Sequence, residues 1–182
     1  IETEHGPDSS GFLVTWSEPL AEQVLTSLPT YLAQMSPMRQ DYALTVLSGT
    51  NGGIVLTKTA EQAYEFINNY APEHCQILSK QPEQHLAKIT TASEILLGEY
   101  AAGSLANYMM GPNCVLPTSG AARTHSPLGV RDFMRTASVG RVSAEGFAEI
   151  APKTEIFARY EGFDAHANAV SSLRGKLMAS DT

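Results

Sequence analysis

The sequence predicts an α/β fold: a parallel-sheet, incomplete Rossmann-like core followed by a C-terminal helical tail. Short apolar runs alternate with helical patterns over the first hundred residues. The runs are apolar at nearly every position, which is typical of parallel strands that helices cover on both faces. After Ser143 only helical patterns remain. We therefore place an α/β core portion, which carries the active-site loop, in residues 1–140 and a helical tail in residues 141–182.

Strands and helices alternate through the core. The apolar runs predict four strands, at Gly11–Thr15, Gly53–Thr57, Cys75–Leu78 and Glu94–Leu97. The helical patterns predict helices from Ser17 to Pro29, over Met38–Leu47, from Thr59 to about Tyr70, and over Pro82–Ile89. Proline cannot donate a backbone hydrogen bond, so Pro29 is expected to end the first helix. Thr59 and Gln62 match a capping box, and the helix they start is expected to bury Ala63, Phe66 and Ile67.

Two later segments have a different character. Residues 98–133 are rich in Gly, Pro, Ser and Asn and show no period, and a long loop in a compact domain is usually functional. From Ser143 to Met178 the chain is helical, and Pro152 and Gly162 are expected to divide it into about three helices. This tail has apolar faces and no sheet of its own. We expect a two-fold homodimer with the tail exchanged between subunits.

Composition restricts the class of protein. The chain has 182 residues, 43% hydrophobic and 17% charged, which fits one globular domain with a core. A net charge of −7 argues against nucleic acid and anionic membrane as general partners. No apolar run reaches the roughly 18 residues of a membrane span. Two cysteines are too few for a disulfide framework and favour the cytoplasm. The first residue is Ile1, so we expect a piece of a longer protein.

Dinucleotide and phosphate motifs are absent from the sequence. No G-x-G-x-x-G follows a predicted strand, and no P-loop occurs. The glycine cluster at Gly49–Gly53 precedes its strand, so we interpret it as a turn. The residues that would bind a nucleotide cofactor are therefore unknown from sequence motifs.

Tyr70–His74 is the most informative stretch for chemistry. Glu73 and His74 are adjacent where a helix gives way to a strand. A carboxylate and an imidazole together can take a proton from an alcohol and activate a water. Pro72 is expected to present the pair stiffly and to bias Ala71 toward extended backbone. Taken alone, a solvated surface Glu-His pair is the commoner meaning of such a sequence.

Several further residues are candidates for metal or ligand binding. Glu2 and His5 have the i,i+3 spacing that puts both on one helical face. Asn107 lies in the irregular segment, His166 opens the last predicted helix, and Cys114 lies within Gly111–Thr118. Each also has a plain structural interpretation, namely a charged helix end, a turn residue, a capping histidine and a small buried hydrophobe.

Four motifs in this order resemble the histidinol dehydrogenase family, the zinc- and NAD-dependent enzymes of histidine biosynthesis. The resemblance covers essentially the whole chain, and the chain looks like the C-terminal portion of much longer family members. The motifs that carry it are Glu4-His5-Gly6-Pro7-Asp8-Ser9, Ala71-Pro72-Glu73-His74, Gly111-Pro112-Asn113 with Val115-Leu116-Pro117-Thr118, and Glu161-Gly162-Phe163-Asp164-Ala165-His166-Ala167.

The resemblance implies a role for each matching residue. Glu73 matches the carboxylate that activates water in the second oxidation, and His74 matches the base. His5 and His166 match the two zinc-binding histidines, and Glu161 matches a carboxylate that contacts substrate. In the family the tail crosses to a second subunit, so Glu161 and His166 would complete the partner's site.

The chain also departs from the family pattern. The other two zinc ligands of the family are a glutamine and an aspartate, where this chain has Glu2 and Asn107. A further histidine that contacts substrate is replaced by Cys114. The donors exchange an amide and a carboxylate without changing the summed charge, so we predict that the four metal positions are Glu2, His5, Asn107 and His166. A thiol instead of an imidazole at position 114 makes histidinol a doubtful substrate.

The resemblance implies an enzyme that oxidises a primary alcohol to a carboxylate with zinc and NAD, as histidinol is oxidised to histidine. One alternative is the same fold acting on another small polar alcohol, such as a sulfonated or phosphorylated diol. A second is a catalytically dead, dimerising module. We expect the 182 residues alone to be inactive, because the part of the family that holds most NAD contacts lies outside them.

Overall fold

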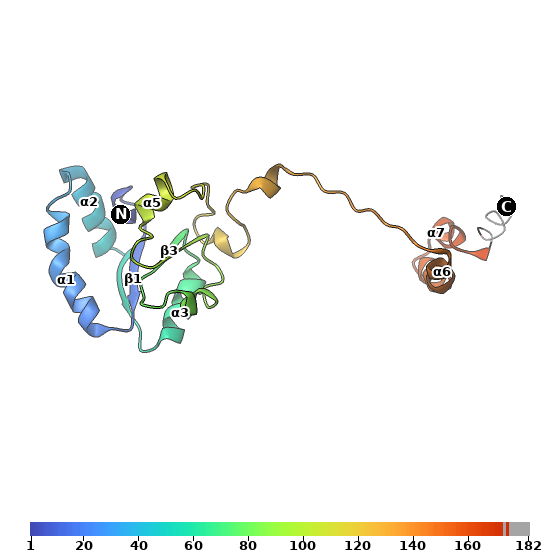
Figure 1. The fold of residues 1–182 in the computed structure, drawn as a ribbon, viewed down its shortest axis with the longest axis horizontal. Coiled ribbons are helices and arrows are strands. Elements are labelled where there is room, and N and C mark those ends of the chain that lie inside the picture. Colours follow the sequence, from blue (N-terminus) through green and yellow to red (C-terminus); the bar gives the residue numbers. More distant parts are fainter. Residues whose placement is uncertain (173, 175–182) are drawn as a thin grey trace. The chain divides into compact units, whose positions relative to one another are not determined.

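The structure is a computed structural model that describes residues 1–172 and 174. It divides into two compact units, Ile1–Phe133 and Met134–Thr182 (Figure 1). In the described residues no helix is both long enough and apolar enough to cross a membrane.

The first unit contains two pairs of parallel strands. β1 (Gly11–Thr15) pairs with β2 (Gly52–Leu56), and Gly11 lies opposite Gly52. β3 (His74–Ile77) pairs with β4 (Glu94–Leu97), and His74 lies opposite Glu94. The predicted α/β class is confirmed. The four strands form two separate ladders within the described residues, where the sequence suggested one sheet.

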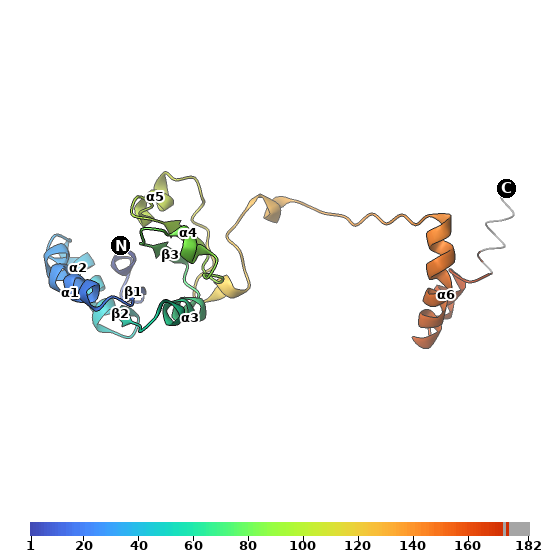
Figure 2. The same ribbon diagram turned by 60° about the horizontal axis from the view of Figure 1, so that its bottom comes forward.

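Helices cover the β1–β2 pair. α1 (Glu18–Leu32) and α2 (Pro37–Ser48) lie side by side, and both views place β1 between them and α3 (Ala60–Tyr70) (Figures 1 and 2). Val46 of α2 is 1% exposed, and a Cβ on Gly52 would lie 2.8 Å from the Val46 carbonyl oxygen. Glycine at the start of β2 therefore allows helix and strand to approach closely.

The prediction that Pro29 ends the first helix is wrong. The helix continues through Pro29 to Leu32, and the Ala33 N–H donates to the Pro29 carbonyl at 3.0 Å. Proline removes only its own hydrogen bond, so one further turn forms from the residues that follow it. The predicted start is confirmed, because the Ser17 hydroxyl accepts from the Leu20 N–H at 3.4 Å.

α3 is anchored at both ends. The Thr59 hydroxyl accepts from the Gln62 N–H at 3.3 Å, while the Gln62 side chain accepts from the Lys58 N–H at 2.9 Å. In a standard capping box the Gln62 side chain would accept from the N–H of Thr59, the N-cap residue. Here it accepts from the N–H of the preceding residue instead. Near the other end, the rings of Phe66 and Tyr70 pack against Phe12 of β1 with centroids 5.6 and 5.3 Å away. Of the helix positions expected to be buried, Ala63 is buried and Phe66 and Ile67 are half-buried.

Short elements complete the first unit. η1 (Glu2–Glu4) precedes β1, and α4 (Glu83–Leu86) is shorter than the predicted Pro82–Ile89. The segment after Gly98 is largely irregular, as expected, but it contains α5 (Gly103–Tyr108), η2 (Ala121–Arg123) and η3 (Val130–Phe133). No period predicted α5, because six residues are too few to establish one.

Two packed helices make up most of the described part of the second unit. α6 (Ala144–Tyr160) begins at Ser143, whose hydroxyl accepts from the Gly146 N–H at 3.1 Å. It continues through Pro152, so the predicted break there is wrong. Gly162, with φ 80°, separates it from α7 (Asp164–Asn168). The predicted helix beyond, with Leu173 and Leu177, lies partly outside the described residues.

Candidate active site

The pairing of β3 and β4 places two ionisable side chains next to each other. The Glu94 N–H donates to the Glu73 carbonyl at 2.9 Å, and the Ser93 N–H donates to the Pro72 carbonyl at 3.1 Å. This register sets His74 opposite Glu94. Side chains of paired residues stand on the same face of adjacent strands roughly 4.8 Å apart. The ladder therefore aligns a carboxylate with the predicted catalytic histidine.

His74 lies between two carboxylates. Its Nδ1 is 3.8 Å from Glu73 Oε1, and its Nε2 is 3.4 Å from Glu94 Oε2. The side chains of His74 and Glu94 are 15% and 10% exposed, whereas that of Glu73 is 37% exposed. Glu73 and His74, the predicted pair, thus lie close together. Nδ1 of the His74 ring faces the more exposed Glu73 carboxylate, and Nε2 faces the buried Glu94 carboxylate.

Glu94 is a site residue that sequence reasoning missed. It opens the strand Glu94-Ile95-Leu96-Leu97, and a carboxylate at the start of a strand suggests an ordinary solvent-facing end. The available signal was a single charged residue in a strand otherwise predicted to be buried. Such a residue is almost never buried without a partner. The partner, His74, is twenty positions earlier and becomes visible only through strand pairing.

The backbone that enters the site differs from the prediction. Ala71 is left-handed, with φ 54° and ψ 66°, where an extended conformation was expected. Its N–H donates to the Ile67 carbonyl at 2.9 Å, which closes the last turn of α3. The helix cap therefore overrides the preference that Pro72 imposes. Ala71 is also 1% exposed, so it is fixed by packing as well as by hydrogen bonding.

Side-chain hydrogen bonds fix the segments around His74. The Asn68 amide oxygen accepts from the Thr90 N–H at 2.8 Å, and the Asn68 carbonyl accepts from the Thr91 hydroxyl at 2.7 Å. The Ser93 hydroxyl donates to the Pro117 carbonyl at 2.9 Å. These bonds tie the approach to β4 to α3 on one side and to the Gly111–Thr118 motif on the other.

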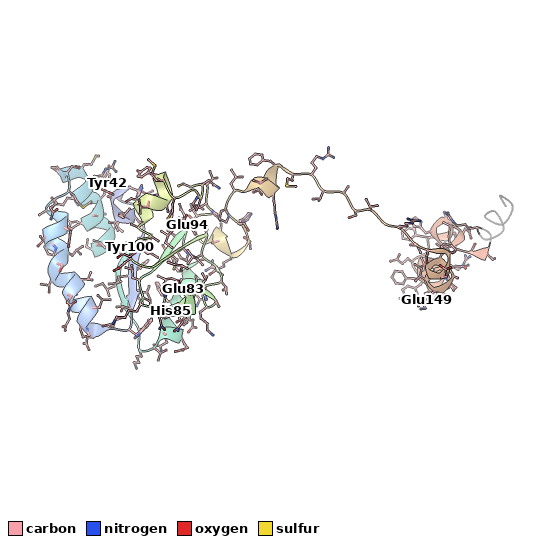
Figure 3. The ribbon with its side chains drawn as sticks, viewed as in Figure 1. Tyr42, Glu83, His85, Glu94, Tyr100 and Glu149 are labelled. Carbon is pink, nitrogen blue, oxygen red and sulfur yellow. The ribbon has the colours of Figure 1, made fainter. Side chains whose placement is uncertain are left out.

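A cavity of about 260 Å³ adjoins Glu94. β4 provides one wall, and the loop after α5 provides another through Pro112, Asn113 and Leu116. Figure 3 labels Glu94 and, separated from it in that view, Glu83 and His85 of α4. The predicted motif Gly111–Thr118 thus forms part of the surroundings of the Glu94–His74 pair.

The metal candidates of the first unit lie around η1 and α5. His5 Nδ1 is 3.9 Å from Glu2 Oε2, and a Cβ on Gly103 would lie 3.8 Å from Glu2 Oε1. Asn107 is one turn beyond Gly103, on the same face of α5. The Cys114 thiol lies 3.5 Å from Asn107 Oδ1. η1 itself is held by Arg39, which donates to the Glu4 carbonyl at 2.7 Å.

Glu161 and His166 belong to the second unit. Glu161 is the C-cap residue of α6, and the ring of His166 on α7 lies tilted by 44° beside that of Phe163, with centroids 5.2 Å apart. The other candidate residues all belong to the first unit, so the second unit alone does not contain a complete set.

The donor set fits zinc only in part within one unit. Residues 1–172 and 174 contain no group of three His, Cys, Asp or Glu side chains that could hold a metal ion. Glu2 and His5 are strong zinc ligands, whereas the amide of Asn107 is a weak one, and a zinc site needs three or four protein ligands. The first unit alone therefore offers two strong donors and one weak one.

The sequence and the fold of the chain are both similar to those of known proteins. A model of the family "Histidinol dehydrogenase" matches residues 1–174. The chain belongs to the histidinol dehydrogenase family. The crystal structure of histidinol dehydrogenase from Elizabethkingia anophelis superposes with a TM-score of 0.87 at 32% identity, covering 97% of this chain and 40% of that one.

Relatives within the family fall into two identity ranges. A "Histidinol dehydrogenase homolog" from Colwellia psychrerythraea is 57% identical over all of this chain and 41% of its own length. "Histidinol dehydrogenase" from Synechocystis is 44% identical over 93% of this chain and 39% of its own length. The chain thus spans about two fifths of the length of the curated relatives that it matches. It is more similar to the Colwellia homolog than to the Synechocystis protein.

The two cysteines are predicted to differ in reactivity. Burial raises the pKa of the Cys75 thiol on β3 from its ordinary 9.0 to about 11, whereas Cys114 is exposed. In the native protein a disulfide-exchange reagent at pH 8 should label one thiol per chain quickly, and Cys114→Ser should remove that reaction. The Cys75 thiol has a pKa near 9.0 in the unfolded chain and about 11 in the folded chain. Its contribution to the free energy of unfolding is therefore fully present below pH 9 and is lost as the pH rises toward 11. Rapid labelling of two native thiols would contradict this assignment.

Proposed function

We propose that the full-length protein is an oxidoreductase that converts a primary alcohol to a carboxylate in two hydride transfers to NAD. The observation that carries the proposal is the placement of His74 beside Glu73 at the start of β3, with Nδ1 and Oε1 3.8 Å apart. Membership of the histidinol dehydrogenase family supports the reaction class. The setting proposed is the cytoplasm, in keeping with two free cysteines.

The chemistry follows from the acid–base properties of the pair. In the first step His74 would take the hydroxyl proton of the alcohol as the carbinol carbon loses a hydride and becomes an aldehyde. Bound NAD would accept that hydride. Glu73 would then remove a proton from water as the water attacks the aldehyde carbon. Once His74 has released its first proton to solvent, it would take the remaining hydroxyl proton of the hydrate as the second hydride passes to another NAD. One alcohol and one water thus yield a carboxylate, two NADH and three protons.

The 182 residues are not expected to complete this reaction alone. They contain no dinucleotide fingerprint and span about two fifths of their relatives. The residues that bind NAD therefore remain unassigned.

A small polar alcohol other than histidinol is the substrate we favour. Position 114 carries an exposed thiol, next to the amide of Asn107, where the resemblance implies a substrate-binding histidine. Removal of a polar partner from a site leaves groups of the old substrate unpaired and discriminates strongly against it. The chain is 57% identical to a protein called a histidinol dehydrogenase homolog and 44% identical to one called histidinol dehydrogenase. This difference also favours a substrate other than histidinol.

Substrate choice is testable with Cys114→His. The full-length protein should reduce NAD readily with a sulfonated or phosphorylated diol and at least about tenfold less efficiently with histidinol. Cys114→His should raise kcat/KM for histidinol, and Cys114→Ser serves as the matched control. Ordinary histidinol kinetics in the wild type would contradict the choice.

Substitutions of the pair should separate the two oxidation steps. His74→Asn should lower kcat by roughly 10²–10⁴-fold, because it removes the general base. Glu73→Gln should slow aldehyde oxidation more than alcohol oxidation, since water attacks only in the second step. NADH formation from the alcohol and from the aldehyde measures both, with Glu83→Gln on the exposed face of α4 as control. Equal, small losses in both steps would remove the pair from the mechanism.

We also propose a zinc ion held by Glu2, His5 and Asn107 together with His166. When bound, zinc would orient the alcohol and polarise its oxygen. The donors carry one carboxylate, one amide and two neutral imidazoles, which is the charge the family set carries. His5 is 61% exposed in the first unit, so the structure leaves that side chain accessible to a further ligand.

Metal analysis of the full-length protein tests the exchanged pair. Glu2→Gln alone should lose zinc because it removes the only carboxylate of the set, and adding Asn107→Asp should restore it. Asn107→Asp alone is the charge control. A wild-type protein without zinc, or equal zinc in all three variants, would end this part of the proposal.

A homodimer is the assembly we propose, with Glu161 and His166 completing the partner's site. Large apolar side chains of the second unit are exposed, with Ile156 at 72% and Phe157 at 61%. Exposed apolar surface of this kind favours a protein interface. Light scattering should give the mass of a dimer at micromolar concentration, and Phe157→Asp should lower it, whereas a monomer in the wild type would argue against exchange.

A further inference from the structure

We propose that Glu94 is a positioning residue that fixes the tautomer of His74. In this arrangement Glu94 accepts the proton on Nε2 of His74 and leaves Nδ1 as the basic nitrogen. The proposal rests on the proposed function for its catalytic consequence, whereas the tautomer itself is a property of the folded protein.

Burial identifies the two atoms as partners. His74 Nε2 and Glu94 Oε2 are 3.4 Å apart, and both are buried side-chain atoms without another hydrogen-bond partner in the described residues. A buried polar atom left unpaired costs about 1–3 kcal/mol. A small rotation of the Glu94 carboxylate forms a hydrogen bond between these two atoms. That single bond gives each of them its partner.

Accessibility then decides which nitrogen reacts. Nε2 is closed off from solvent, so it cannot exchange a proton with a bound alcohol. Nδ1 faces Glu73, whose side chain is 37% exposed. A base must reach its substrate proton directly or through one water. Nδ1 meets that condition, provided that the proton of the neutral ring is kept on Nε2.

A carboxylate on the far nitrogen supplies that constraint. A hydrogen bond to one imidazole nitrogen sets the tautomer and ring orientation and raises the basicity of the other nitrogen. The two carboxylates are thereby assigned different tasks by their environments. Glu73 is half-exposed and available to water, whereas Glu94 is buried and held by the β3–β4 register.

Glu94→Gln tests the proposal with little change in shape. In the full-length protein kcat for alcohol oxidation should fall by about 10–100-fold, the range typical for loss of a group that orients a functional histidine. KM should stay within about twofold, because the proposal gives Glu94 a role through His74 rather than through substrate binding. Exposed Glu83 supplies the matched control, and Glu83→Gln should leave both constants unchanged. Unchanged kcat in Glu94→Gln would overturn the proposal.

Rescue by a small acid distinguishes positioning from packing. Glu94→Ala opens a space beside the cavity of about 260 Å³, large enough to admit formate. Sodium formate should restore part of kcat in Glu94→Ala, and sodium chloride at the same concentration should not. If Glu94 merely filled space, formate would have no effect beyond that of chloride.

Nitrogen NMR of the histidine-labelled full-length protein reads the tautomer without turnover. The wild type should carry its proton on Nε2 of His74, and Glu94→Ala should shift the ring toward a mixture of tautomers. A wild-type ring protonated on Nδ1 overturns the proposal even in an active enzyme. The two proposals can also fail separately. If the His74 ring is protonated on Nε2 but the protein oxidises no alcohol, the Glu94 contact is supported and the proposed function is refuted.

Discussion

The register of one short parallel ladder is the constraint on which the candidate site depends. Backbone bonds from Glu94 to Glu73 and from Ser93 to Pro72 fix the alignment. A slip by one residue would turn the Glu94 side chain to the opposite face and bring apolar Ile95 to His74. The ladder is only four residues long on each strand, so the Asn68 and Ser93 side-chain bonds contribute to holding its ends.

The site combines a buried part and an exposed part with different physical supports. His74 and Glu94 are enclosed, and charges at that depth interact more strongly than at the surface. Glu2 and His5 lie on a single turn that Arg39 holds through bonds to the Glu4 and His5 carbonyls. The His74–Glu94 pair thus has the more rigid support, whereas the Glu2 and His5 side chains are 39% and 61% exposed.

Sequence reasoning succeeded where the signal is local and failed where it is not. β1 and β4 have their predicted bounds because each apolar run is bounded by turn residues. Pro29 and Pro152 were expected to break helices, yet packing of the surrounding turns retains them inside α1 and α6. Glu73–His74 was visible as adjacent letters. Glu94 was not, because its meaning arises only from pairing between strands twenty residues apart.

The backbone at Ala71 restricts how this site can change. A left-handed residue with a side chain costs about 1–2 kcal/mol, and at 1% exposure a larger side chain has no room. Glycine, which has no Cβ, is consequently the substitution that the position accommodates in place of the native alanine. The stretch around Met110–Cys114, by contrast, is exposed. Under the proposed function, a library of variants for a new alcohol would therefore sample that stretch and leave Ala71 unchanged.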